Sequence, residues 1–281
     1  MLLGIFILVL AISISYKFQP FTLLIRILSS TSLVLYLYLL LTLVNGEEGK
    51  SFNQIIEPGS PKVEKLNVQI SDNQISYVKI KEEVLIDAPI IKQFPELPRG
   101  CEVTSLAMLL QYRGIQIEKM DLAAKIKKDT TPLRRVNGTI YWGSPYNGFI
   151  GDMYSYSNPG YGVYHQPIKD LAEQFLPGQI IDLTGREFAN LKIYLSLDIP
   201  IWVIINTTYK KLPETAFESW QTPDGEIKIT YKEHSVLITG YDDQNIYFND
   251  PISGLKNRAI LIDDFIEAWK QMGSQAITYL P

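Results

Sequence analysis

The chain has only one cysteine and two histidines among its 281 residues, so the side chains that most often carry nucleophilic or metal chemistry are few. The single cysteine, Cys101, excludes an intrachain disulfide. His165 and His234 are 69 positions apart (234 minus 165), and no cysteine or carboxylate cluster has metal-ligand spacing. We therefore expect no metal ion and no cofactor.

An excess of basic charge is also missing. The net charge of -4 leaves none of the basic footprint that nucleic-acid-binding proteins usually carry. The phosphate-binding motif Gly-x-x-x-x-Gly-Lys-Ser/Thr does not occur in the sequence. With 46% hydrophobic and 20% charged residues, global disorder is excluded. The sequence predicts a folded protein that binds neither nucleic acid nor nucleotide.

Charged residues are nearly absent from the first 44 positions. Met1–Ser15 has none, and Ile27–Val44 is an uncharged run of 18 residues, which is long enough for a spanning helix. The first stretch covers only roughly 22 Å of a bilayer core about 30 Å thick. A signal-peptide core is the alternative for that stretch, although no basic residue precedes it. Residues 1–44 are predicted to form a transmembrane anchor of one or two helices.

The orientation of this anchor follows from its flanking charges. Lys17 and Arg26 precede the second apolar run, and Glu47 and Glu48 follow it. Basic residues stay on the cytoplasmic side. The localisation expected is the cell membrane, with the C-terminal domain extracytoplasmic. An unpaired cysteine is a liability there, which favours a reactive role for it.

A linker is predicted between the anchor and the folded domain, over residues 45–83. Its first part is polar, with glycine and proline breakers. Around Leu66–Ile80 apolar and polar residues alternate on either side of Ser71-Asp72-Asn73, which is typical of a short hairpin.

Residues 84–281 are predicted to form one α+β domain, helical in its first half and built of antiparallel strands in its second. Apolar spacing of three and four predicts helices at Glu102–Arg113, Glu118–Lys128, Pro167–Phe175, Gly185–Leu195 and Asp263–Met272. Apolar runs bounded by turn residues predict strands at Ile201–Ile205, Ile227–Tyr231, Ser235–Tyr241, Ile246–Asn249 and Gln275–Tyr279.

A long segment, Thr130–His165, separates the two halves. It has little periodicity and is rich in glycine, asparagine and tyrosine. Loops this long inside a domain are usually functional. We expect it, with Trp142, to line or cover a substrate groove.

Cys101 directly precedes the first predicted helix. Thiolate is the reactive form of cysteine, and a helix N-terminus stabilises negative charge. Gly100 before it allows a tight turn and close approach of a substrate. Cys101 is therefore a candidate nucleophile with a lowered pKa. The alternative is a small buried hydrophobe, as free cysteines usually are. Glu102 is interpreted as complementing the helix dipole.

The remaining members of a catalytic set have candidates as well. His234 begins an apolar strand and is the expected base, and Asp250, at the end of the next strand, would orient its ring. Gln93 could add a side-chain amide to the Cys101 backbone N–H in an oxyanion hole. Taken singly, each has a plainer interpretation: a core histidine, a turn cap and a surface residue.

Three segments carry a family resemblance: GCEVTSLAMLLQYRG, TYKKLPETAFESWQTP and HSVLITGYDDQNIYFNDP. They resemble the extracytoplasmic relatives of the bacteriocin-processing, double-glycine cysteine peptidases, over about residues 88–281. The resemblance implies a papain-like fold, with Cys101 as nucleophile, His234 as base, Asp250 as orienting acid and Gln93 as oxyanion amide.

The function predicted is that of a papain-like cysteine peptidase, a hydrolase that cleaves peptide or protein substrates through an acyl-enzyme on Cys101. Two alternatives remain open. One is an acyl transferase or amidase that uses the same triad on cell-wall peptides. The other is a non-catalytic peptide-binding module on the cell surface.

Overall fold

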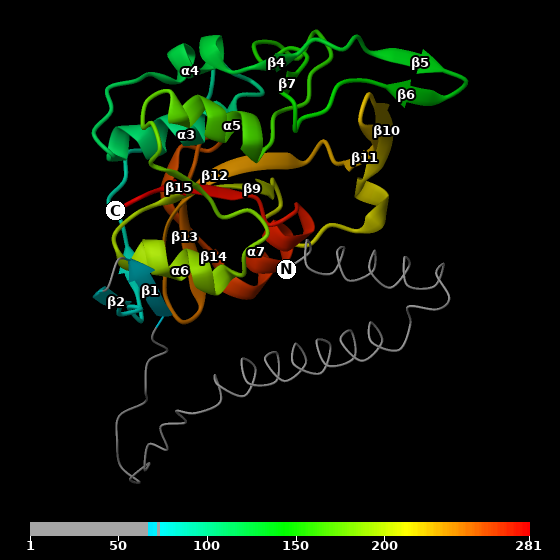
Figure 1. Cartoon of the computed structure of the whole chain (residues 1–281). Coiled ribbons are helices and arrows are strands. Elements are labelled where there is room, and N and C mark those ends of the chain that lie inside the picture. Colours follow the sequence, from blue (N-terminus) through cyan, green and yellow to red (C-terminus); the bar gives the residue numbers. More distant parts are fainter. Residues whose placement is uncertain (1–66, 72–73) are drawn as a thin grey trace, which may run out of the picture. The chain divides into compact units, whose positions relative to one another are not determined.

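The computed structural model describes residues 67–71 and 74–281 (Figure 1). The predicted anchor, residues 1–44, lies outside the described residues. Among the residues that are described, no helix is long and apolar enough to cross a membrane. The alternating segment of the linker forms two antiparallel strands, β1 (Asn67–Ser71) and β2 (Gln74–Val78).

A mixed α+β fold is confirmed, with an antiparallel sheet of seven strands at its centre. In spatial order its main path runs β14 (Leu255–Leu261), β13 (Asn245–Asp250), β12 (Glu233–Tyr241), β9 (Ile201–Asn206), β15 (Ala276–Tyr279) and β8 (Ile180–Asp182). The seventh strand, β3 (Val84–Leu85), pairs with β12. Every residue of β9 is buried, which fits a central strand covered on both faces.

Helices cover both faces of this sheet (Figure 1). On one side lie α3 (Cys101–Tyr112) and α5 (His165–Glu173), and on the other lie α6 (Phe188–Ser196) and α7 (Ile262–Gln271). The short α4 (Lys119–Lys125) packs against α3. A single-turn helix, η1 (Glu214–Ala216), follows β9 and directly precedes the strand at Glu218–Thr222.

The strand β12 pairs with β9 on one side and β13 on the other, and this register places its polar residues. His234 is opposite Ile205 of β9, and Leu237 is opposite Asn249 of β13. At Gly240 an added Cβ would lie 1.9 Å from the carbonyl oxygen of Val84, so only glycine lets β3 pair there. The first residues of β12 and the last residue of β13 therefore lie at one end of the sheet.

The segment predicted as a long loop contains short strands. A smaller sheet has the order β11 (Gly225–Ile229), β10 (Glu218–Thr222), β6 (Thr139–Tyr141) and β5 (Arg134–Val136). A parallel pair joins β4 (Lys128–Asp129) to β7 (Phe149–Ile150). The helix predicted at Glu118–Lys128 is therefore shorter than expected. It ends at Lys125, because Lys128 pairs with Phe149 as part of β4.

Candidate active site

Cys101 is the first residue of α3, one position earlier than the helix predicted from apolar spacing. Thr104 closes the first turn, because its backbone N–H and its hydroxyl both donate to the Gly100 carbonyl, at 3.0 and 2.7 Å. A Cβ at Gly100 would lie 2.5 Å from Cβ of Leu97, so a side chain there would push the preceding loop away. Glycine is thus needed for packing.

Two hydrogen bonds hold the start of α3 on the central sheet. The indole Nε1 of Trp202 in β9 donates to the Glu102 carbonyl at 3.0 Å. The hydroxyl of Ser105 donates to the Ser235 carbonyl in β12 at 3.1 Å. The nucleophile candidate and the strand that carries His234 are therefore fixed to each other by buried contacts.

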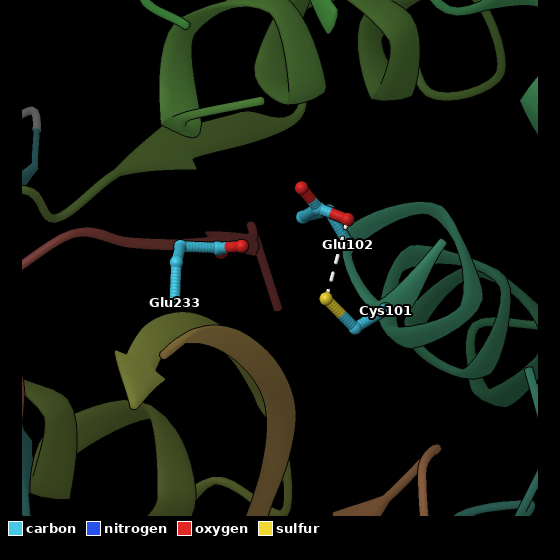
Figure 2. Close-up of side chains that lie close together, drawn as sticks. All are labelled: Cys101, Glu102 and Glu233. Atoms are coloured by element: carbon cyan, nitrogen blue, oxygen red, sulfur yellow. Dashed lines mark hydrogen bonds between the residues drawn. The ribbon is translucent and has the colours of Figure 1, made fainter. Parts of the chain in front are cut away.

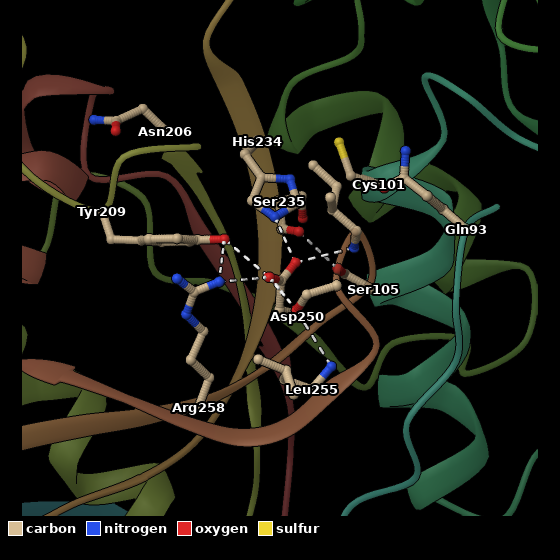
Figure 3. Close-up of polar contacts among 12 residues, drawn as sticks. Gln93, Cys101, Ser105, Asn206, Tyr209, His234, Ser235, Asp250, Leu255 and Arg258 are labelled. Carbon is tan, nitrogen blue, oxygen red and sulfur yellow. Dashed lines mark hydrogen bonds and ion pairs between the residues drawn. The ribbon is translucent and has the colours of Figure 1, made fainter.

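His234 and Asp250 form a buried pair at the end of the sheet. Nε2 of His234 lies 3.0 Å from Oδ1 of Asp250, and both side chains are essentially inaccessible. Figure 3 shows the imidazole between this carboxylate and the side chain of Cys101. Because Asp250 accepts at Nε2, the neutral ring keeps Nδ1 as its acceptor. Nδ1 has no hydrogen-bond partner among the described residues.

Asp250 is held by more than the histidine. Its carboxylate accepts from the hydroxyls of Tyr209 and Ser253 at 2.9 and 2.6 Å, and from Nη1 of Arg258 at 3.1 Å. Burial opposes the charged form, but the hydrogen bond and charge of His234, with these hydroxyls, hold the pKa of Asp250 far below its usual range. Asp250 is therefore ionised beside the imidazole.

The thiol of Cys101 faces two carboxyl groups, which were not predicted as site residues (Figure 2). Its Sγ lies 3.3 Å from Oε2 of Glu102. One ligand atom from each of Cys101, Glu102 and Glu233 lies within 4.8 Å of the other two. Glu233 directly precedes His234, and that adjacency was the one signal for it in the sequence.

These carboxyls reverse the expected shift of the thiol. Burial and then the charges of Glu102 and Glu233 raise the pKa of Cys101 well above its ordinary value. Burial also raises the pKa of Glu102 to about 7, and burial with the charge of Glu102 raises that of Glu233. In the free site these effects favour the neutral thiol over the thiolate.

Gln93 is buried and belongs to the same pocket as Cys101. Its Nε2 donates to the carbonyl oxygens of Leu97 and Pro98, at 3.2 and 2.9 Å, so both amide hydrogens are engaged. Its backbone N–H donates to the Pro251 carbonyl, next to Asp250, at 2.9 Å. Gln93 thus lines the same pocket as the thiol, and a role as oxyanion donor would require its amide to break one of these two hydrogen bonds.

The second histidine lies in a separate pair. Nδ1 of His165, at the start of α5, lies 2.8 Å from Oδ2 of Asp182 in β8. Although burial opposes it, the hydrogen bond from His165 lowers the pKa of Asp182 to about 2. His165 therefore has its own carboxylate partner.

The thiol opens onto a pocket of about 330 Å³. Its walls come from the Gln93 loop, the long segment before α5 and the start of β12: Gln93, Pro98, Arg99, Cys101, Tyr156, Gly160, Tyr161, Thr207, Tyr231, Glu233 and Ile252. The long segment thus lines the pocket through Tyr156, Gly160 and Tyr161, as expected of it.

Trp142 does not line this pocket, contrary to the sequence-based expectation. It is 5% exposed and packs against Trp220, with ring centroids 5.4 Å apart. Both belong to a second hydrophobic cluster, between the long segment and the smaller sheet. A buried aromatic in a loop cannot be told from a groove residue by its spacing, because both face inward.

Trp142→Ala is therefore expected to lower the free energy of unfolding by about 3–5 kcal/mol, because it removes a buried ring. Its effect on KM for peptides should be small. Tyr156→Ala is the matched control: its ring is 63% exposed and lines the pocket, so KM should change more than stability. Thermal melts and KM values measure both. A larger change in KM than in Tm for Trp142→Ala would contradict this placement.

Comparison with known proteins identifies the family of the chain. The model of the Peptidase C39 like family matches residues 85–277. The uncharacterised Bacillus subtilis (strain 168) protein YvpB is 46% identical over 183 residues, which cover 65% of this chain and 70% of that protein. A crystal structure of a proposed C39-like peptidase from Bacillus anthracis has a TM-score of 0.66 and 43% identity, covering 72% of this chain and 98% of that one. The chain belongs to the Peptidase C39 like family.

Proposed function

We propose that this chain is a papain-like cysteine peptidase that cleaves peptide bonds through an acyl-enzyme on Cys101. The observation that supports this most is the buried His234–Asp250 pair, with the free nitrogen of the ring on the Cys101 side. A structural histidine rarely leaves a buried ring nitrogen without a partner. A base that must accept a thiol proton needs it free.

The reaction then follows from the groups in place. Nδ1 of His234 takes the proton of the Cys101 thiol, and the thiolate attacks the peptide carbonyl carbon. The resulting oxyanion accepts from the backbone N–H of Cys101 and from the Gln93 amide. The imidazolium, stabilised by Asp250, gives its proton to the leaving amine. Water, activated by the same imidazole, then releases the acyl group and restores the thiol.

The raised pKa of the Cys101 thiol fits a Cys101–His234 pair in which the proton moves only when a substrate is bound. In the free enzyme the carboxyl groups around Sγ disfavour thiolate. A nucleophile that is activated by an adjacent base does not need to be a thiolate in the free enzyme. A peptide-library digest by the full-length protein tests the proposal against Cys101→Ala. Cleavage at defined sites by the wild type alone supports it, and equal digestion by both proteins contradicts it.

We propose also that residues 1–44 anchor the chain in the cell membrane and leave the peptidase domain extracytoplasmic. The support is the position of Lys17 and Arg26 before the second apolar run. Reporter fusions at residue 60 are expected to be active with a reporter that works only outside the cytoplasm and inactive with one that works only inside. The reverse pattern would remove the localisation claim and leave the peptidase proposal untouched.

A further inference from the structure

A pair of carboxyl groups beside the nucleophile, a buried one from Glu102 and a half-buried one from Glu233, has no part in the reaction described above. Glu102 is the second residue of α3, and Glu233 is the first residue of β12. Figure 2 shows their carboxyl groups and the thiol of Cys101 directed at one shared space from two different elements. This inference rests on the proposed function, since it concerns the substrate of the same site.

The pair has no cationic partner in the described part of the chain, where no ion pair involves either residue. Glu102 accepts from the Val163 N–H at 2.7 Å and from the thiol. Arg99 lines the pocket, but its guanidinium donates to the backbone carbonyls of Asp152 and Ser155 and lies over the ring of Tyr156. Two buried carboxyls this close stay charged only when a cation joins them.

Two unpartnered polar atoms belong to side chains that line the pocket beside the thiol, those of Gln93 and Glu233. Four buried side-chain N or O atoms lack a hydrogen-bond partner among the described residues: Gln93 Oε1, Glu233 Oε1, His234 Nδ1 and Ser235 Oγ. Gln93 and His234 are 1% and 0% exposed. The first two atoms are acceptors, and the reaction proposed above uses neither of them. Buried acceptors without donors are rare in native proteins, so a ligand that brings donors is indicated.

We propose that Glu102 and Glu233 form a subsite that binds a primary ammonium group of the substrate next to the carbonyl attacked by Cys101. An ammonium group supplies three donors and a positive charge. The rings of Tyr161 and Tyr231, which also line the pocket, attract cations as well. Glycine at position 162 keeps the wall open, because a Cβ there would lie 2.5 Å from Oε1 of Glu102.

Two sources of ammonium are distinguishable by reach. The α-nitrogen of a residue lies about 2.5 Å from its own carbonyl carbon. A lysine side chain instead carries its ammonium at the end of a four-carbon stem. Since the carboxyl oxygens lie within 4.8 Å of Sγ, the geometry favours a free α-ammonium on the residue whose carbonyl is attacked. The substrates are then peptides with a free N-terminus, from which the enzyme removes the first residue.

Alkylation of Cys101 in the full-length protein tests the subsite without requiring turnover. Two alkylation rates of Cys101 are measured in buffer with a chelator, one with 2-bromoethylammonium and one with iodoacetamide. The first rate is divided by the second. The same ratio is measured for the free thiol N-acetylcysteine as the reference. We expect the protein's ratio to be higher by about tenfold, the effect of one charge contact. Because both reagents react with thiolate, a change in thiol pKa cancels from the ratio.

Variants assign the effect to the carboxyl pair. Glu233→Gln and, independently, Glu102→Gln should reduce the ratio to that of the free thiol. Glu218→Gln, an exposed glutamate of β10 that makes the same charge change, should leave it high. Two glutamate variants keep the test decisive when one of them fails to fold. A wild-type ratio equal to that of the free thiol, or one unchanged by both variants, overturns the subsite.

Chloromethyl ketones separate the two sources. Faster labelling by the leucyl reagent than by its acetylated form identifies an α-ammonium. Faster labelling by the acetyl-lysyl reagent than by acetyl-norleucyl identifies a side-chain ammonium. No preference in either comparison overturns the proposal. These measurements read alkylation, so a protein that labels selectively but cleaves no peptide would contradict the proposed function and keep the subsite.

Discussion

Cys101→Ala and His234→Ala are each expected to reduce peptide cleavage on the order of 10⁶-fold, which in practice means loss of detectable turnover. The two side chains act as one unit, so removal of either costs about as much as removal of both. Burial and two carboxyl groups already disfavour the thiolate of Cys101. Without His234 to accept the thiol proton, iodoacetamide should therefore label Cys101 more slowly at neutral pH. Turnover with a cleaved library peptide and the pH profile of alkylation measure these effects.

The control is His165→Ala. That histidine is bound to Asp182 and sits at the start of another helix, so both turnover and thiol reactivity should stay near wild type. Dependence of alkylation on His165, with none on His234, would show that the assigned base is wrong.

Asp250 variants should separate orientation from charge. Asp250→Asn keeps a hydrogen-bonding group beside His234 and should retain the fold while slowing turnover. Asp250→Ala leaves Tyr209, Ser253 and Arg258 without their shared acceptor. Breaking a buried charged pair costs about 3–5 kcal/mol, so we expect a much lower Tm for this variant. Similar melting of Asp250→Ala and the wild type would contradict the buried network.

The low pKa of Asp250 predicts a pH dependence of stability. Its value in the folded protein lies below the value of about 3.9 for an unfolded chain. The stabilisation is therefore present above about pH 3.9 and is lost as the pH falls further toward the folded value. Asp250→Asn should flatten this acid loss in denaturant titrations, and Asp243→Asn, at an exposed turn, should not. An unchanged acid slope in Asp250→Asn would contradict the shift.

Local patterns pointed to the candidate groups of the site, and the family resemblance assigned their roles. The cysteine lies before a periodic apolar segment, and helix nucleation there needs only neighbours in sequence. His234 and Asp250 begin and end consecutive strands, and an antiparallel pair with a short turn brings such ends together. Because these relations are set within tens of residues, the sequence predicted them.

Long-range packing decided what the sequence did not show. Glu102 and Glu233 are 131 positions apart (233 minus 102), and they meet only because α3 is fixed on β12. The reversed shift of the thiol pKa follows from that meeting. Strand β14 has no fully buried residue, so it lacks the apolar run that marked its neighbours. The burial of Trp142 depends on Trp220, which comes from a distant strand.

The hydrogen bonds of Trp202 and Ser105 that hold α3 on the central sheet determine whether the site can open separately from the rest of the fold. The Glu102 and Ser235 carbonyls accept hydrogen bonds from buried side chains, so the start of α3 and the start of β12 hold each other in place. Separating α3 from the sheet breaks these buried contacts, which is close to global unfolding. Heat should therefore abolish activity and tertiary structure in one cooperative step.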